Sequence, residues 1–179
     1  NLWRLGVRPA VFDHFCGGVN ETDCLRVVDK MCTKGVSSVL DYSVEGKEEE
    51  AQFDAALNMT LKTIEFARER EAIPFAVFKP TGFGRLALYE KVGDKAHLTE
   101  NEQKEWNRVI ERFDIACKTA FEKDVLLLID AEESWMQDAA DAIVTDMMRK
   151  YNKQKAIVFN TLQMYRWDRL DYLKNLHDQ

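Results

Sequence analysis

After Val125 the chain reads Leu126-Leu-Leu-Ile-Asp130-Ala-Glu132-Glu133-Ser134-Trp135, an apolar run that leads into three carboxylates and then into a helix start. An apolar run of this length, bounded by turn signals, is typical of a buried strand in a parallel sheet. Ligand sites of α/β proteins lie at the carboxyl ends of such strands. The sequence therefore predicts the rim of a functional site around Asp130.

Three other strand-like segments alternate with helical segments along the chain. The four predicted strands are residues 37–43, 74–80, 125–130 and 156–161. The predicted helices cover about residues 48–71 and 85–91, then begin at Thr99 and at Ser134, and finally cover about 166–177. Strands that alternate with helices are typical of parallel sheets with right-handed crossover connections.

The predicted helices carry both start signals and an apolar face. Thr99-Glu-Asn-Glu102 and Ser134-Trp-Met-Gln137 match the capping box, in which two side chains each bond the other residue's backbone N–H. Apolar residues at steps of three and four predict faces that pack on the core. These faces are Phe53, Leu57, Leu61 and Ile64; Trp106, Ile110, Phe113 and Cys117; and Met136, Ala140, Ile143 and Met147.

The predicted fold class is α/β, with a helical lead-in over residues 1–35. The lead-in contains an amphipathic segment from Cys24 to Cys32 and ends at Gly35, a residue type that terminates helices well. Two closures fit the alternation: an open doubly wound sheet or part of a (β/α)8 barrel. A complete barrel needs about 250 residues, so residues 36–179 would supply only its first four βα units.

Length, composition and charge are those of a single globular domain. The chain has 179 residues, of which 46% are hydrophobic, and can bury a sizeable core. Its net charge of −6 disfavours nucleic-acid binding, because phosphates require a basic surface. The sequence contains no apolar run of about 18 residues, the length that spans a membrane. Because it starts at Asn1 rather than Met, we expect the natural N-terminus to lie upstream.

The cysteines and histidines do not predict a metal site. The gaps between Cys16, Cys24 and Cys32 are longer than the two to four residues typical of zinc ligands. The three histidines are also too far apart in sequence to form a ligand pair. Reduced thiols packed in a cytosol-like compartment are the simpler interpretation.

Every predicted strand ends in polar residues, which would meet at one mouth if the strands are adjacent and parallel. These residues are Asp41 with Glu45, Lys79, Asp130 with Glu132 and Glu133, and Asn160 with Gln163. Lys79 is the most unusual, because a buried lone ammonium is costly and must reach solvent or find a partner. An ion pair with Asp130 would satisfy Lys79 structurally, and the spacing does not decide between that role and a catalytic one.

The carboxylates also allow more than one interpretation. Asp130 and Glu132 could be Mg²⁺ ligands, since oxygen-rich strand ends often bind that ion. Glu132 and Glu133 could equally lie in the first turn of the next helix, where carboxylates meet the positive end of the helix dipole. Glu45 could similarly serve only to start the first helix after its strand.

Taken in order, the strand ends resemble those of the proline dehydrogenase family. The segments that carry the resemblance are Leu40-Asp-Tyr-Ser-Val-Glu45, Phe78-Lys79-Pro-Thr-Gly-Phe-Gly-Arg85, Asp130-Ala-Glu-Glu-Ser134, and Val158-Phe-Asn160-Thr-Leu-Gln163-Met-Tyr165. The similarity covers about residues 10–175 and is closer to the stand-alone mitochondrial and bacterial enzymes than to the long bifunctional ones. Four motifs in order, each at a strand end, make the resemblance specific.

The resemblance implies a distorted (β/α)8 barrel that holds FAD noncovalently at the carboxyl ends of its strands. It implies oxidation of L-proline to 1-pyrroline-5-carboxylate, with electrons passed to a quinone and peripheral contact with a membrane. A bacterial protein would then be cytoplasmic and peripheral to the inner membrane, and a eukaryotic one mitochondrial. In this chemistry the flavin performs the redox step, and the protein positions the substrate carbon and tunes the ring.

By position, the resemblance implies a role for each strand-end residue. Lys79 would grip the carboxylate of proline, and Glu45 would pair with a substrate-binding arginine. Asp130 would lie where flavin and substrate meet and would orient cationic neighbours. Asn160 and Gln163 would place side-chain amides near the flavin, although Asn160 stands where some bacterial relatives carry the longer Gln. No metal is implied.

Two parts of the family pattern are absent from the 179 residues: a fifth-strand segment Leu-Val-Arg-Gly-Ala-Tyr and a late helix with an Arg-Arg pair. Their loss would remove bidentate partners of proline and leave open strand edges. We therefore expect this chain alone to bind little FAD and to turn over no proline. The alternatives are a lyase that uses a metal or a Schiff base at Lys79, and an inactive interaction domain that dimerises through the open edge.

Overall fold

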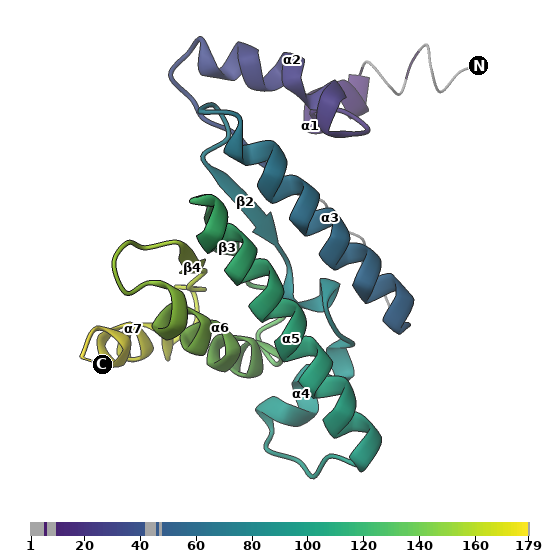
Figure 1. Ribbon diagram of the computed structural model, residues 1–179, viewed down its shortest axis with the longest axis vertical. Helices are drawn as coiled ribbons and strands as arrows, with labels where there is room; N and C mark the ends of the chain where they lie inside the picture. The colour runs from purple at the N-terminus through teal and green to yellow at the C-terminus, as the bar shows by residue number, and fades with distance from the viewer. Residues whose placement is uncertain (1–5, 7–9, 42–45, 47, 179) are drawn as a thin grey trace.

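The structure, a computed structural model, describes residues 6, 10–41, 46 and 48–178. Its centre is a parallel four-stranded sheet in which consecutive strands are neighbours (Figure 1). The strands are β1 (Val39–Leu40), β2 (Phe75–Phe78), β3 (Leu126–Ile129) and β4 (Val158–Asn160). The helices are α1 (Asp13–Phe15), α2 (Glu21–Cys32), α3 (Glu50–Arg68), the 3-10 helix η2 (Pro80–Gly82), α4 (Leu86–Gly93), α5 (Glu100–Lys123), α6 (Gln137–Tyr151) and α7 (Arg169–His177). The predicted α/β class with four βα units is confirmed.

The helices cover one face of the sheet more completely than the other. Helix α3 packs on β2 and α5, and α6 packs on β4 and α5. On β2 and β3 the residues facing these helices, such as Ala76 and Leu127, are fully buried, whereas the residues that alternate with them are only half-buried. Figure 1 shows α1 and α2 at one end of the molecule and α4 at the other. The sheet therefore has one closed face and one partly open face.

The two predicted capping boxes have different outcomes. The first is confirmed: Thr99 N donates to Glu102 Oε2 at 2.9 Å, and Glu102 N donates to Thr99 Oγ1 at 3.3 Å. The second is wrong, because α6 begins at Gln137 and its N-cap, Met136, makes no side-chain cap bond. The Gln137 side chain instead accepts a hydrogen bond from Glu132 N, which keeps the preceding turn out of the helix.

Most residues of the predicted apolar faces are buried, with one clear exception. The face of α6 from Met136 to Met147 is buried as predicted, and so is Phe113 on α5. Ile110, however, is 37% exposed, and Val109 is fully buried in its place. On this helix the buried residues Trp106, Val109 and Phe113 are spaced by three and four positions. Ile110 therefore lies at the edge of the buried face.

The lead-in forms the predicted helix, α2, with Asn20 Oδ1 accepting from Asp23 N at 2.8 Å at its start. Beyond its end, Gly35 takes a φ of 72°, a left-handed conformation that favours glycine. Among the described residues, no helix is long and apolar enough to cross a membrane.

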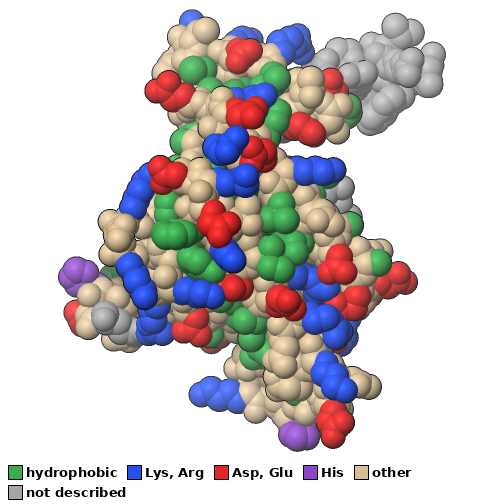
Figure 2. Space-filling view, in the orientation of Figure 1, with side chains coloured by type: hydrophobic (Ala, Val, Ile, Leu, Met, Phe, Trp, Pro, Cys, Tyr) green, Lys and Arg blue, Asp and Glu red, His purple; other side chains and the backbone are tan. Residues whose placement is uncertain are grey.

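Helices α3 and α5 are joined by the buried guanidinium of Arg112, which is 4% exposed. Its Nη2 pairs with Glu50 and with Asp54 Oδ1, the latter at 2.7 Å, and its Nη1 donates to the Phe83 carbonyl at 3.1 Å. Arg108 Nη2 also donates to Glu50, at 2.8 Å. Figure 2 shows acidic and basic side chains interspersed over this face. The paired charges fix the long α5 against α3.

We expect Glu50→Gln to remove a pH-dependent part of the stability. The hydrogen bond from Arg108, together with Arg112 and against the effect of burial, lowers the pKa of Glu50 from 4.5 to about 2. A lowered folded-state pKa gives stability that is present above the unfolded pKa and is lost as pH falls toward the folded pKa. The unfolding free energies of the two proteins should therefore differ at pH 6 and converge near pH 2 in urea titrations. Glu122→Gln, at an exposed pair with Lys118, is the control, and a constant Glu50 difference across pH would contradict this expectation.

Candidate functional site

The register of β2 and β3 sets the centre of the candidate site. Phe78 lies opposite Ile129 in this parallel pair, so the next residues, Lys79 and Asp130, leave the sheet side by side. Asp130 N donates to the Phe78 carbonyl at 3.0 Å, which continues the pairing by one step. Lys79 Nζ donates to Asp130 Oδ2 at 2.7 Å. The ion pair considered in the sequence is therefore present.

A third strand contributes to the same group. Asp41 follows β1, and its Oδ2 lies 3.8 Å from Lys79 Nζ. The carboxyl ends of β1, β2 and β3 thus bring one ammonium and two carboxylates together. Glu45, the other polar residue predicted at the end of the first strand, lies outside the described residues.

The surroundings of Lys79 keep its amine protonated. Burial opposes the charge of this half-buried side chain, but the hydrogen bond and charge of Asp130, with Asp41 and Glu132, outweigh burial and raise the pKa of Lys79. At neutral pH the group is an ammonium that can bind an anion. A protonated amine does not attack a carbonyl, so this environment disfavours the Schiff-base interpretation.

Glu132 holds the loop after β2 rather than the start of α6. Its Oε2 accepts from Thr81 N at 2.8 Å and its Oε1 from Thr81 Oγ1 at 2.7 Å. Burial raises the pKa of the Glu132 carboxyl, and the hydrogen bonds from Thr81 offset that effect only in part. Both oxygens are thus engaged within the protein. The described residues form no group of three or more His, Cys, Asp or Glu side chains able to hold a metal ion.

The two predicted amide side chains at the end of β4 differ in their hydrogen bonding. Asn160 Nδ2 donates to Asp141 Oδ1 at 2.9 Å, and its Oδ1 accepts from Thr161 N at 2.9 Å. Gln163 is 7% exposed, and its Nε2 donates to the Glu132 carbonyl. Gln163 Oε1 is buried and has no hydrogen-bond partner among the described residues. Gln163 therefore offers an acceptor, whereas Asn160 is tied to its neighbours.

A buried polar cluster behind these amides was not anticipated from the sequence. Asp141 on α6 and Arg169 on α7 are 2% and 4% exposed, and Arg169 Nη1 donates to Asp141 Oδ2 at 2.5 Å. Gln137 Nε2 also donates to Asp141, at 2.9 Å. The sequence signal for this cluster was the four-residue spacing of Gln137 and Asp141, which places both side chains on one face of a helix. The predicted capping box assigned the Gln137 side chain to a different partner.

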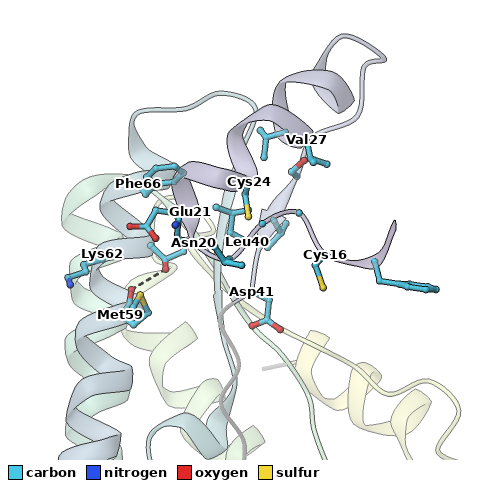
Figure 3. Close-up of a pocket in the computed structure, with 18 residues that line it drawn as sticks. Cys16, Asn20, Glu21, Cys24, Val27, Leu40, Asp41, Met59, Lys62 and Phe66 are labelled. Atoms are coloured by element: carbon cyan, nitrogen blue, oxygen red, sulfur yellow. Dashed lines mark hydrogen bonds between the residues drawn. The ribbon is translucent and has the colours of Figure 1, made fainter. Parts of the chain in front are cut away.

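A cavity of about 580 Å³ lies between the lead-in, β1 and α3 (Figure 3). Its apolar lining includes Leu40, Met59 and Phe66, and Figure 3 shows Cys24 above Leu40 and Cys16 at the right. Asp41 also lines the cavity and contacts Lys79, so the cavity adjoins the charged group at the strand ends. The sequence did not indicate this cavity, because its walls come from segments predicted only as lead-in and helix.

The fold and the site define an α/β protein whose parallel sheet carries a group of charged and polar side chains at the carboxyl ends of its strands. A family model for proline dehydrogenase matches residues 24–179, and the chain belongs to that family.

The chain is similar to other proteins over most of its length, and one of these is a proline dehydrogenase by name. The chain is 33% identical over 165 residues to the carbapenem antibiotics biosynthesis protein CarD of Pectobacterium carotovorum subsp. carotovorum, covering 92% of this chain and 44% of that protein. It is 25% identical over 205 aligned positions to the mitochondrial proline dehydrogenase 1 of Dictyostelium discoideum, covering 94% of this chain and 36% of that protein. The chain thus spans less than half the length of these relatives.

The fold is also that of solved structures of proline utilization A. The structure of that protein from Bdellovibrio bacteriovorus, inactivated by N-propargylglycine, superposes with a TM-score of 0.73 at 15% identity. The match covers 92% of this chain and 18% of the other. At this identity the likeness concerns the fold alone.

Proposed function

We propose that the chain forms part of an FAD-dependent enzyme that oxidises L-proline to 1-pyrroline-5-carboxylate. Residues 36–179 would be the N-terminal half of its (β/α)8 barrel, and residues 1–35 a helical lead-in. The observation that carries the proposal is the protonated Lys79 at the strand ends, held by Asp130 and Asp41 in a chain of the proline dehydrogenase family.

Lys79 is suited to bind the carboxylate of proline. Its ammonium is half-buried, so that a charge-assisted hydrogen bond to a carboxylate is stronger there than in open water. Asp130 holds the amine in place, and Asp41 Oδ2 lies 3.8 Å from it. Glu45 would pair with a substrate-binding arginine, as the family resemblance implies.

The residues present fit a flavin. When bound, FAD would supply the acceptor for the two electrons that leave the carbon beside the proline nitrogen. Gln163 Oε1, buried and without a partner in the described part of the chain, matches a ligand that carries N–H or O–H donors, as the ring and ribityl chain of a flavin do. Asp130 and Gln163 would hold the cofactor, with Asn160 contributing through its second amide proton.

Exposed apolar side chains after β4 support the half-barrel part of the proposal. After β4, large apolar side chains are exposed, among them Trp167, which is fully exposed, and also Met164, Tyr165 and Leu170. The remaining half of the barrel would cover such surface. For the isolated 179-residue chain we therefore propose little FAD binding and no turnover.

The electron acceptor and the location follow from the same family. A quinone would receive the electrons at a membrane surface that the enzyme contacts peripherally. The protein would be mitochondrial in a eukaryote, as the relative from Dictyostelium is by its name, and cytoplasmic beside the inner membrane in a bacterium.

The test compares the natural full-length protein with the 179-residue chain. We expect the full-length protein to show a flavin absorption spectrum and to reduce a dye when L-proline is added, whereas the isolated chain does neither. L-Alanine, which has the carboxylate and amine but no ring, is the control substrate. A full-length protein without flavin, or without proline-dependent reduction, would overturn the proposed function. Proline-dependent reduction by the isolated chain would overturn the half-barrel assignment.

A further inference from the structure

Asp141 is the centre of a buried hydrogen-bond cluster beside the candidate site. Its Oδ1 accepts from Gln137 Nε2 and from Asn160 Nδ2, each at 2.9 Å, and its Oδ2 accepts from Arg169 Nη1 at 2.5 Å. A buried ion pair is tolerated when further hydrogen bonds satisfy both partners. Arg169 is satisfied as well, because its Nε donates to Asp168 at 3.0 Å and its Nη2 to Asp138 at 3.3 Å. Neither Asp141 nor Arg169 contacts the charged group around Lys79.

Each amide that donates to Asp141 has a second partner that fixes its orientation. Gln137 Oε1 accepts from Glu132 N at 3.2 Å, and Asn160 Oδ1 accepts from Thr161 N at 2.9 Å. A backbone N–H can only donate and a carboxylate can only accept, so neither amide can rotate by half a turn without placing donor against donor. Asp141 thereby fixes the loop after β3 and the loop after β4 at once.

The two fixed loops meet at Gln163. Its Nε2 donates to the Glu132 carbonyl, and the adjacent Thr161 Oγ1 donates to the Ile129 carbonyl at 3.0 Å. Because a carbonyl can only accept, the nitrogen of Gln163 must face Glu132 and its oxygen must face away. That oxygen is the buried acceptor without a partner in the described chain.

We propose that Asp141, paired with Arg169, is a positioning residue that holds the loops after β3 and β4 so that Gln163 Oε1 accepts a hydrogen bond from an N–H or O–H of the bound flavin. The identity of the ligand rests on the proposed function, whereas the positioning role rests on the hydrogen bonds of Asp141. Asp141 touches neither ligand nor substrate and acts through Gln137 and Asn160.

The decisive variant is Asp141→Asn in the natural full-length protein. The asparagine side chain keeps the shape but replaces one acceptor oxygen by a donor, which then faces either Arg169 or the two amides. We expect FAD to bind about tenfold more weakly, measured by quenching of flavin fluorescence, and the visible band of the bound flavin to shift at saturating FAD. Asp146→Asn is the matched control, because Asp146 lies on the same helix with its side chain 72% exposed. This control should bind FAD within about twofold of the unmodified protein.

A second variant separates positioning from simple loss of stability. In Asp141→Asn the guanidinium of Arg169 loses its buried partner and keeps only Asp138 and Asp168. Adding Arg169→Met removes that guanidinium, so we expect the thermal midpoint to recover while the affinity for FAD stays low. Recovery of both would overturn the positioning role, and so would an Asp141→Asn protein with unchanged affinity and spectrum.

Proton exchange of the side-chain amides, followed by NMR without FAD, tests the cluster independently of the cofactor. We expect the amide protons of Gln137 and Asn160 to exchange faster in Asp141→Asn than in Asp146→Asn. Equal exchange rates would overturn the inference even if FAD binds. An unmodified protein that binds no FAD would overturn the proposed function, and with it the ligand named here, whatever the exchange rates show.

Discussion

Replacing Lys79 with methionine should lower kcat/KM for L-proline in the full-length protein by about a hundredfold to a thousandfold, or about 3–4 kcal/mol of transition-state stabilisation. Methionine keeps most of the apolar stem but has no charge, so the carboxylate of proline would lose its charge-assisted partner. Asp130 and Asp41 would then face that carboxylate without the cation that lies between them now. Repulsion adds to the loss of attraction, which is why the expected effect is large.

Steady-state kinetics distinguish this role from a structural ion pair. If Lys79 binds substrate, the variant should have a raised KM for proline, whatever the loss of the ion pair does to the thermal midpoint. If the ion pair with Asp130 only stabilises the sheet end, the midpoint should fall and KM should not change, and the proposed role would be wrong. Lys155→Met is the control, because Lys155 forms an exposed pair with Asp124 at 2.6 Å. Exposed pairs contribute little, so both quantities should stay unchanged.

Phe113→Ala should destabilise the protein by about 3–5 kcal/mol in denaturant unfolding, the usual cost of truncating a buried phenylalanine. Phe113 on α5 is fully buried, and its ring makes edge contacts with Phe78 at 5.1 Å and Phe83 at 5.6 Å between centroids. Phe78 and Phe83 also stack on each other at 4.4 Å. Alanine would leave a cavity under the end of β2. The loss therefore combines transfer free energy, cavity formation and aromatic contacts.

Phe121→Ala supplies the matched comparison on the same helix. Phe121 is 48% exposed, with one tilted ring contact to Tyr151 at 5.7 Å. The expected loss is about 1–1.5 kcal/mol, since about half of its surface remains in water after folding. Equal destabilisation by the two substitutions would show that the aromatic group of Phe78, Phe83 and Phe113 does not anchor the end of β2.

The alternation of strands and helices could be predicted from the sequence because each element has a simple periodicity. The polar strand ends could be predicted because they directly follow the apolar runs. An apolar run such as Leu126–Ile129 has only one stable place in an α/β protein, the interior of the sheet. A lysine at the end of such a strand needs a partner, and Asp130 was the carboxylate at the matching position of the next strand. The ion pair was one of the two interpretations that these facts allowed, and the structure contains it. The roles assigned to these residues stay predictions until the variants are measured.

The buried cluster could not be predicted in the same way. No periodicity distinguishes a charged residue that faces the core, such as Asp141, from one on the solvent side of the same helix. Its partners Asn160 and Arg169 come from β4 and α7, and only the folded chain brings them together. The errors at Gln137 and Ile110 have a related origin, because local patterns allow several helix starts and faces and tertiary packing selects one.

The pairing of β2 with β3 limits how this protein can vary in length. Phe75 to Phe78 lie opposite Leu126 to Ile129 one by one, and the ion pair follows in the next step. Loss or gain of a single codon within either strand would turn every later side chain of that strand to the opposite face. Lys79 or Asp130 would then point into the helices. Descendants of this sequence can therefore change residues in these strands gradually, but insertions and deletions should accumulate only in the connections between strands and helices.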